Sequence, residues 1–176
     1  MELIRIGDKV VDRTRIYRMV DRILELRASG LSQQEVADKL GIDRTLVSRL
    51  ESVGEVRRGR RIGLVGFPVK NRQELEELAR AEGIDFVWLL TDAERRAWVA
   101  EKSGAELLNE IMVLIAQARE LDHVIFLGSD MRIRLVEALL GSDRVTGIQI
   151  GSSPITEDRY VNPERIRQLV RHLKAI

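Results

Sequence analysis

The chain has 176 residues, of which 44 % are hydrophobic and 32 % are charged, a balance that supports one or two folded domains. It contains no cysteine, which excludes a disulfide framework and a thiolate metal site. No signal-peptide pattern follows Met1 and no apolar run is long enough to cross a membrane. We therefore expect a cytoplasmic protein with no membrane partner.

Charge is divided unevenly along the chain, although the net charge is only +1. Residues 1–61 hold 14 Lys and Arg against 10 Asp and Glu, which gives +4, whereas residues 62–176 hold 15 against 18, which gives −3. Positive charge favours phosphate contacts and steers association with nucleic acid. Any nucleic-acid interface is therefore expected in the first part.

The first 30 residues predict a leading segment and one long helix. Residues 3–11 indicate either a short strand or an irregular arm, and residues 12–28 carry apolar side chains at helical spacing. Ser29 and Gly30 then close the helix. We expect it to pack against the two helices of the next segment.

Residues 31–51, LSQQEVADKLGIDRTLVSRLE, predict two short helices joined by a tight turn. Ser32 and Glu35 form a capping-box pattern at the first helix, and Gly41 supplies the left-handed conformation that ends it. Asp43 is expected to cap the second helix. The apolar positions of that second helix are Leu46, Val47 and Leu50.

Polar and basic side chains remain on the outer face of the second helix. They are Arg44, Thr45, Ser48 and Arg49. Arg binds guanine in a bidentate manner, and Thr and Ser contact bases or phosphates, so this face suits the DNA major groove. Gln33 begins the first helix and is placed for a phosphate contact. The alternative is a helical hairpin with a solvated outer face.

This segment resembles the XRE-type helix-turn-helix of the λ-repressor and Cro superfamily. The matching positions are Gln33, Ala37, Gly41, Val47 and Leu50. The resemblance implies a transcriptional regulator of the repressor class that binds operator DNA as a homodimer. It further implies that double-stranded DNA is contacted by Gln33, Arg44, Thr45 and Ser48.

The sequence departs from the family after the second helix. The family usually adds further helices, whereas residues 52–67, SVGEVRRGRRIGLVGF, indicate strand and turn. We therefore expect a shorter trihelical DNA-binding domain over residues 1–60, with or without a small β-wing. A basic run ends this domain, formed by Arg57, Arg58, Arg60 and Arg61. It is either a phosphate-contacting wing or a solvated linker.

From residue 61 onward, short apolar runs alternate with helix signals. The expected strands are 62–67, 84–90, 123–128 and 145–150. Capping boxes are indicated at Asn71 with Glu74, Thr91 with Glu94 and Ser103 with Glu106, and Asn162-Pro163 starts a last helix. Apolar strands alternating with helices predict a parallel sheet covered on both faces. Residues 61–176 are thus expected to form a small Rossmann-like α/β domain.

Ligands of open parallel sheets bind beyond the carboxyl ends of the strands. The sequence places Lys70, Ser129, Ser152 and Ser153 there, which suits a small anionic effector bound by charge and by hydroxyl groups. The competing interpretation is that these loops are ordinary turns and helix caps, which use the same residue types. The second domain is expected to serve dimerisation, effector binding or both.

No recognised catalytic pattern is present. The dinucleotide-binding glycine motif, the phosphate-binding loop and the nucleophile elbow are all missing, and His123 and His172 lack a metal-ligand spacing. We therefore expect no enzyme, no cofactor and no metal, but a regulator that binds an inverted repeat as a homodimer. The alternative from another class is a small-molecule enzyme with an accessory helix-turn-helix.

Overall fold

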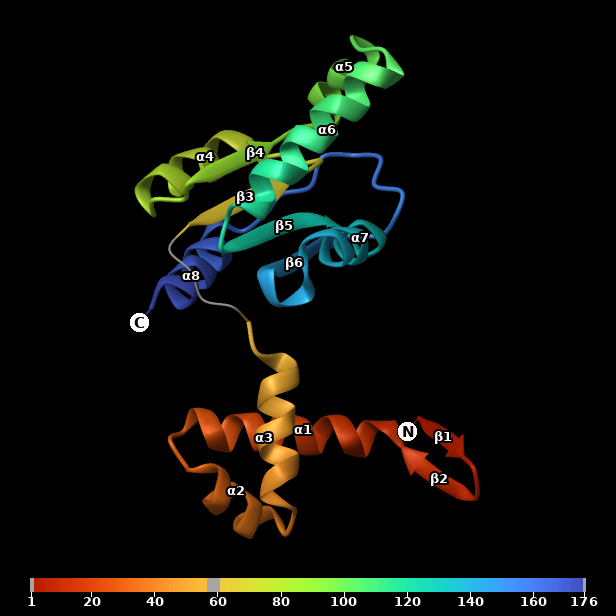
Figure 1. The fold of residues 1–176 in the computed structure, drawn as a ribbon, viewed down its shortest axis with the longest axis vertical. Coiled ribbons are helices and arrows are strands. Elements are labelled where there is room, and N and C mark those ends of the chain that lie inside the picture. The colour runs from red at the N-terminus through yellow and green to blue at the C-terminus, as the bar shows by residue number, and fades with distance from the viewer. Residues whose placement is uncertain (1, 57–60, 176) are drawn as a thin grey trace. The chain divides into compact units, whose positions relative to one another are not determined.

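The structure is a computed structural model, and it describes residues 2–56 and 61–175. The chain divides into two compact units, Met1–Glu55 and Val56–Ile176, each with its own elements (Figure 1). The predicted DNA contacts at Arg57, Arg58 and Arg60 lie outside the described residues.

The first unit consists of a strand pair followed by three helices. These elements are β1 (Leu3–Ile6), β2 (Lys9–Asp12), α1 (Arg13–Ala28), α2 (Gln33–Leu40) and α3 (Arg44–Gly54). The two strands pair antiparallel and extend from the start of α1, while α3 crosses α1 (Figure 1). The leading segment is thus a β-hairpin.

The end of α3 differs from the expectation. Residues 52–54 continue the helix, whereas the sequence indicated strand and turn from residue 52. The Ser52 hydroxyl donates at 3.0 Å to the carbonyl of Ser48, which lies four residues earlier, one turn back along the helix. In the described part of this unit, the strand pair precedes the helices instead of following them as a wing.

The core of the first unit is small. Its buried side chains are Ile23, Leu26, Val36, Ala37 and Val47, and partly buried Leu31, Leu40, Ile42 and Leu50 pack around them. The prediction of Leu46 as an apolar core position was wrong, because its side chain is 49 % exposed. Val47 is the buried position of α3, and position 46 lies about 100° from it around the helix, at the edge of the buried face.

The second unit contains a four-stranded parallel sheet, which confirms the predicted Rossmann-like α/β fold. The strand order is β4 (Phe86–Leu89), β3 (Ile62–Gly66), β5 (His123–Ser129) and β6 (Val145–Gly151). The helices are α4 (Arg72–Ala81), α5 (Asp92–Ala100), α6 (Gly104–Arg119), α7 (Asp130–Leu140) and α8 (Pro163–Lys174), with a 3-10 turn at Ser142–Arg144.

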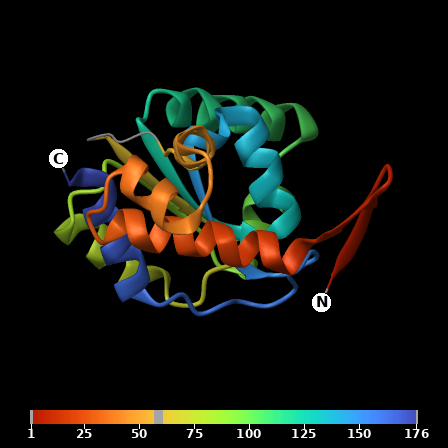
Figure 2. The same ribbon diagram turned by 90° about the horizontal axis from the view of Figure 1, so that it is seen from below.

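The two faces of the sheet are packed differently. The face toward α4 and α8 is aliphatic and fully covered; its buried strand residues are Ile62, Leu64, Leu89, Ile125, Leu127 and Ile148. The opposite face meets α6 and α7 through a smaller cluster of Ala118, Leu121 and Val124. Figure 2 shows α6 and α7 together on one side of the sheet and α8 on the other.

Helix caps follow the sequence, with one exception. Both capping boxes at Thr91 and Ser103 are present. Asn71, however, makes no side-chain cap for α4. Its amide instead donates to the Val161 carbonyl at 2.8 Å and accepts from the Val161 N–H at 2.9 Å. The predicted capping box was wrong because a partner 90 residues away in the chain takes the Asn71 amide.

Candidate nucleic-acid interface

Local hydrogen bonds fix the turn between α2 and α3. Ser32 and Glu35 form a complete capping box at the start of α2, with bonds of 3.2 Å and 2.7 Å. These bonds to Ser32 lower the pKa of the Glu35 carboxyl below its ordinary value. Gly41 ends α2 in the left-handed region, with a φ of 65°. The first helix of the pair therefore starts and stops where the sequence predicts.

The start of α3 is set by Asp43, whose carboxylate accepts the Thr45 N–H at 2.6 Å. The hydrogen bond with the Thr45 side chain, and then the one with its N–H, lower the pKa of the Asp43 carboxyl below its ordinary value. Val47 is buried against the other helices, and this burial determines which side of α3 faces outward. On that outer side, Arg44, Thr45 and Arg49 are exposed, whereas Ser48 is half-buried.

Exposed side chains of this kind suit base recognition at the amino-terminal end of a recognition helix. Arg44 and Arg49 offer forked donors for guanine, and Thr45 and Ser48 offer hydroxyl groups.

A polar network that the sequence did not indicate joins the three helices. The Glu51 carboxylate of α3 accepts from the Arg27 guanidinium of α1 and, at 2.8 Å, from the Gln33 amide of α2. Arg27 and then Gln33 lower the pKa of Glu51 through these hydrogen bonds. The predicted phosphate contact Gln33 is thus half-buried and held toward α3.

The four predicted ligand-binding residues of the second unit fall into two places. Lys70 is exposed and lines a polar pocket with Asn71, Arg72 and Thr91 among others, but with none of the three serines. Ser129 is buried and its hydroxyl caps α7 by accepting the Arg132 N–H at 3.4 Å.

Ser152 and Ser153 lie beside Ser129, because Gly151 is its partner in the β5–β6 register. Both are exposed, and the Ser153 N–H donates to Asp130 at 3.3 Å. The structure therefore brings the three serines together and leaves Lys70 in a separate pocket.

The chain itself crosses the carboxyl ends of β3 and β4. Arg159 pairs in parallel with Val69, and the Lys70 N–H donates to the Arg159 carbonyl at 2.8 Å. The Asp92 N–H donates to the Asp158 carboxylate at 2.7 Å. Asp158 and Arg159 thus bond to backbone groups that an open sheet leaves for a ligand.

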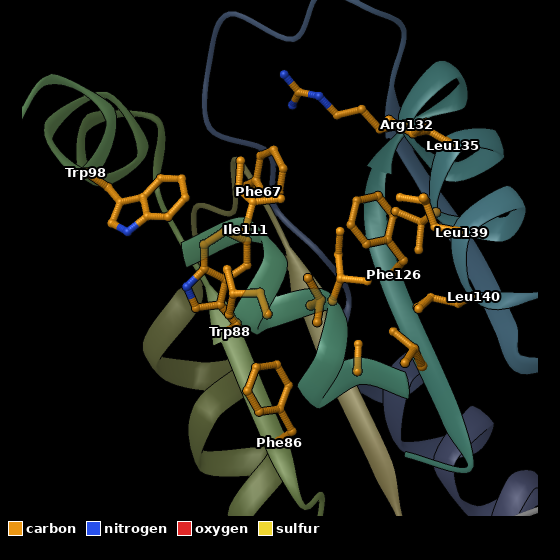
Figure 3. Close-up of a pocket in the computed structure, with 16 residues that line it drawn as sticks. Phe67, Phe86, Trp88, Trp98, Ile111, Phe126, Arg132, Leu135, Leu139 and Leu140 are labelled. Atoms are coloured by element: carbon orange, nitrogen blue, oxygen red, sulfur yellow. The ribbon is translucent and has the colours of Figure 1, made fainter. Parts of the chain in front are cut away.

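A second pocket lies on the α6 and α7 side of the sheet (Figure 3). It is an apolar cavity of about 320 Å³, lined by all three phenylalanines and both tryptophans of the chain. Phe67 packs edge-to-face against Trp88 and Phe126, with ring centroids 5.7 Å and 6.1 Å apart. These aromatic residues come from separate segments, so no local sequence pattern indicated the cavity.

Neither histidine forms part of a polar cluster of catalytic type in the described ranges. His123 is buried, with its Nε2 2.9 Å from the Thr146 hydroxyl. The Nδ1 of His172 lies 2.7 Å from the Gln168 carbonyl on its own helix.

Comparison with known families agrees with this geometry. Residues 23–52 match the family described as Helix-turn-helix, a span from the middle of α1 to near the end of α3. No curated protein and no solved structure matches the chain. Within residues 2–56 and 61–175, none of the helices has the length and apolar character required to span a membrane.

Residues 23–52 are therefore an XRE-like helix-turn-helix, the module that DNA-binding regulators use, as the sequence predicted. The match ends at residue 52 and leaves the second unit without a recognised family.

Proposed function

We propose that this protein is a sequence-specific transcriptional regulator that binds an inverted-repeat operator as a homodimer and responds to a small anionic effector in its α/β unit. The outer face of α3, with Arg44, Thr45 and Arg49 exposed and Ser48 half-buried beside them, is the observation that carries this proposal, because such a face can enter a major groove. The regulator is proposed to act without catalysis.

Dimerisation is supported by the surface of α6. Three large apolar side chains of this helix are exposed and do not pack in the core of their own unit: Leu108, Met112 and Val113. A run of such residues on one helix is typical of a protein–protein interface. A single recognition helix offers few base contacts, and two-fold pairing of two such helices supplies the rest.

Selection of genomic DNA fragments by the purified full-length protein tests the operator. We expect enrichment of an inverted repeat whose half-site centres lie about one DNA turn apart, roughly 34–36 Å. Recovery of random fragments alone would contradict sequence-specific binding.

Sedimentation of the full chain at micromolar concentration tests the dimer. We expect Met112→Lys to dissociate it, because the side chain is 61 % exposed and a charge there is costly only when the surface is covered. Val53→Lys, at an exposed apolar position of α3, is the matched control and leaves the dimer intact. A monomeric wild-type protein, or a Met112→Lys dimer, would contradict this interface.

A further inference from the structure

The aromatic cavity is open to solvent on one side, because Ile111, Leu135 and Leu139 of its lining are exposed. An apolar hollow of this kind on a folded domain is typical of a ligand or partner site. Here about 320 Å³ remains between the sheet, α5, α6 and α7, within the size range of small-molecule sites. Leu135 of α7 lines the cavity and is also exposed, so a ligand can enter beside this helix.

The lining defines the chemistry of the main part of the ligand. Fifteen of the sixteen lining residues are apolar or aromatic, and Arg132 is the exception. A sugar, a nucleotide or a polyol would lose its hydrogen bonds to water in such a cavity and regain almost none. The bulk of the ligand must therefore be hydrocarbon or aromatic.

Arg132 defines the other end of the ligand. Its side chain reaches from α7 over the Phe67 ring, with the guanidinium carbon 4.8 Å from the ring centroid (Figure 3). Its Nη1 is buried and has no hydrogen-bond partner among the described residues, so a carboxylate bonds to it once the Arg132 side chain turns toward the cavity. A buried guanidinium nitrogen without a partner is costly, and arginine binds carboxylates through two parallel hydrogen bonds.

A second arginine increases the positive charge at this place. Arg95 of α5 is near enough to Arg132 to lower its pKa, in addition to the larger effect of burial. Arg95 pairs with Asp92 at 2.6 Å, but Asp92 also pairs with Arg96, and the Arg95 Nε is buried without a partner among the described residues. Arg95 thus adds positive charge near Arg132, although it is not itself part of the cavity lining.

We infer that this cavity binds an amphipathic monocarboxylate, with the carboxylate on Arg132 and the hydrocarbon body among Phe67, Trp88 and Phe126. This site is separate from Lys70 and from the three serines. It deepens the proposed function by giving the effector a class and a place, and only its effect on DNA binding rests on that function. Binding itself is measurable without DNA.

Tryptophan fluorescence provides the test, because Trp88 and Trp98 are the only tryptophans of the chain and both line the cavity. The full-length protein is titrated with octanoate, decanoate and dodecanoate below the concentrations at which they aggregate, and with decanol as the uncharged match. We expect saturable changes, with affinity rising about four-fold for each added methylene. We also expect decanoate to bind more tightly than decanol.

Two variants locate the carboxylate. Arg132→Gln should weaken decanoate binding by about ten- to a hundred-fold and leave decanol binding unchanged. Arg134→Gln, on the same helix but 74 % exposed, is the matched control and should bind like the wild type.

Equal binding of decanol and decanoate by the wild type would overturn the inference, and that comparison needs no variant. Tryptophan emission that changes with protein concentration, but with none of the added carboxylates, would also overturn the inference. It would mean that a second copy of the chain fills the cavity. Failure of DNA selection, in contrast, would refute the regulator and leave the ligand site standing.

Discussion

The two units of this chain differ most in the size and origin of their cores. The helix-turn-helix unit is held by five buried side chains from three neighbouring helices. The α/β unit buries fourteen side chains on one face of its sheet alone, drawn from strands and helices far apart in the sequence. The larger unit can therefore remain folded with an open cavity on the other face of its sheet. Among its described residues, the smaller unit has no buried side chains beyond the few that hold its helices together.

This difference predicts unequal consequences of the same substitution. Ile23→Ala and Leu64→Ala each remove a fully buried aliphatic side chain and should each cost about 2–5 kcal/mol. Typical stabilities per residue give about 3–8 kcal/mol for the first unit and about 6–18 kcal/mol for the second. The cost of Ile23→Ala is thus comparable with the whole stability of its unit, so partial unfolding is expected there, whereas Leu64→Ala should leave the sheet folded.

Circular dichroism and tryptophan fluorescence distinguish the two outcomes. Both tryptophans belong to the second unit, so their emission should be unchanged in Ile23→Ala while helical signal is lost. In Leu64→Ala, the sheet should still be native without denaturant. The midpoint of its urea unfolding, followed by tryptophan fluorescence, should be lower than in the wild type. Leu135→Ala, at an exposed position, is the control and should change this midpoint little. A folded Ile23→Ala protein would show that core size does not govern the comparison.

Sequence reasoning succeeded where a structure depends on adjacent residues. The Ser32 capping box, the Gly41 turn and the Asp43 cap each involve residues within a few positions, and all three are present. The alternation of strands and helices in the second unit is likewise a local periodicity. These local patterns were enough to predict the recognition motif and the α/β class.

It failed where distant segments meet. The Arg27–Glu51 ion pair joins residues 24 apart, and the Asn71–Val161 bonds join residues 90 apart. The cavity requires Phe86 of β4, Phe126 of β5 and Phe67, directly after β3, on the same side of the sheet, which follows only from the order β4-β3-β5. The capping pattern at Asn71 was misleading because a long-range partner competes for the same amide.

The next prediction concerns the recognition of bases by α3. It tests whether the helix-turn-helix unit alone determines the DNA-sequence specificity. Arg44→Ala should cost about 1–3 kcal/mol on the selected operator and relax preference at one base pair, since Arg44 is exposed at the start of α3. Binding isotherms on the operator and on a random duplex give the comparison, with exposed Lys39→Ala as the control. Equal weakening on both duplexes would instead make Arg44 a phosphate contact.

The long-range character of the α/β unit is tested by Asn71→Ala. The change removes both bonds to Val161, together with the Asn71 amide's local bond to the Glu74 carboxylate at 2.8 Å, and leaves the backbone groups of buried Val161 without these partners, at a cost of about 1–3 kcal/mol. Asn162→Ala, which removes a local cap of α8, should cost about 1 kcal/mol. Urea unfolding followed by fluorescence ranks the two. A larger loss for Asn162→Ala would mean that the local cap matters more than the long-range bonds.

The smallest expected effect concerns acid and the first unit. The Arg27 and Gln33 hydrogen bonds hold the pKa of Glu51 below its ordinary value of 4.5. A carboxyl group with a depressed pKa in the folded state contributes stability that is complete above its unfolded pKa and is lost as the pH falls through the folded one. The helical unit should therefore weaken below a pH of about 4.5, and Glu35 and Asp43, whose pKa values are also lowered, should add to this loss.

Thermal unfolding followed by circular dichroism over a range of acidic pH isolates the contribution of Glu51. Glu51→Gln should lower the unfolding midpoint near neutral pH and flatten its dependence on pH below about 4.5, because the ionisation is removed together with the charge on the ion pair. Glu55→Gln, one turn further along at an exposed position beyond α3, is the matched control. The effect must be modest, since the Arg27 and Glu51 side chains are both about one-third exposed and water screens their attraction. If Glu51→Gln and Glu55→Gln follow the same pH curve, the network does not stabilise the three helices, and the small unit depends on its five buried side chains alone.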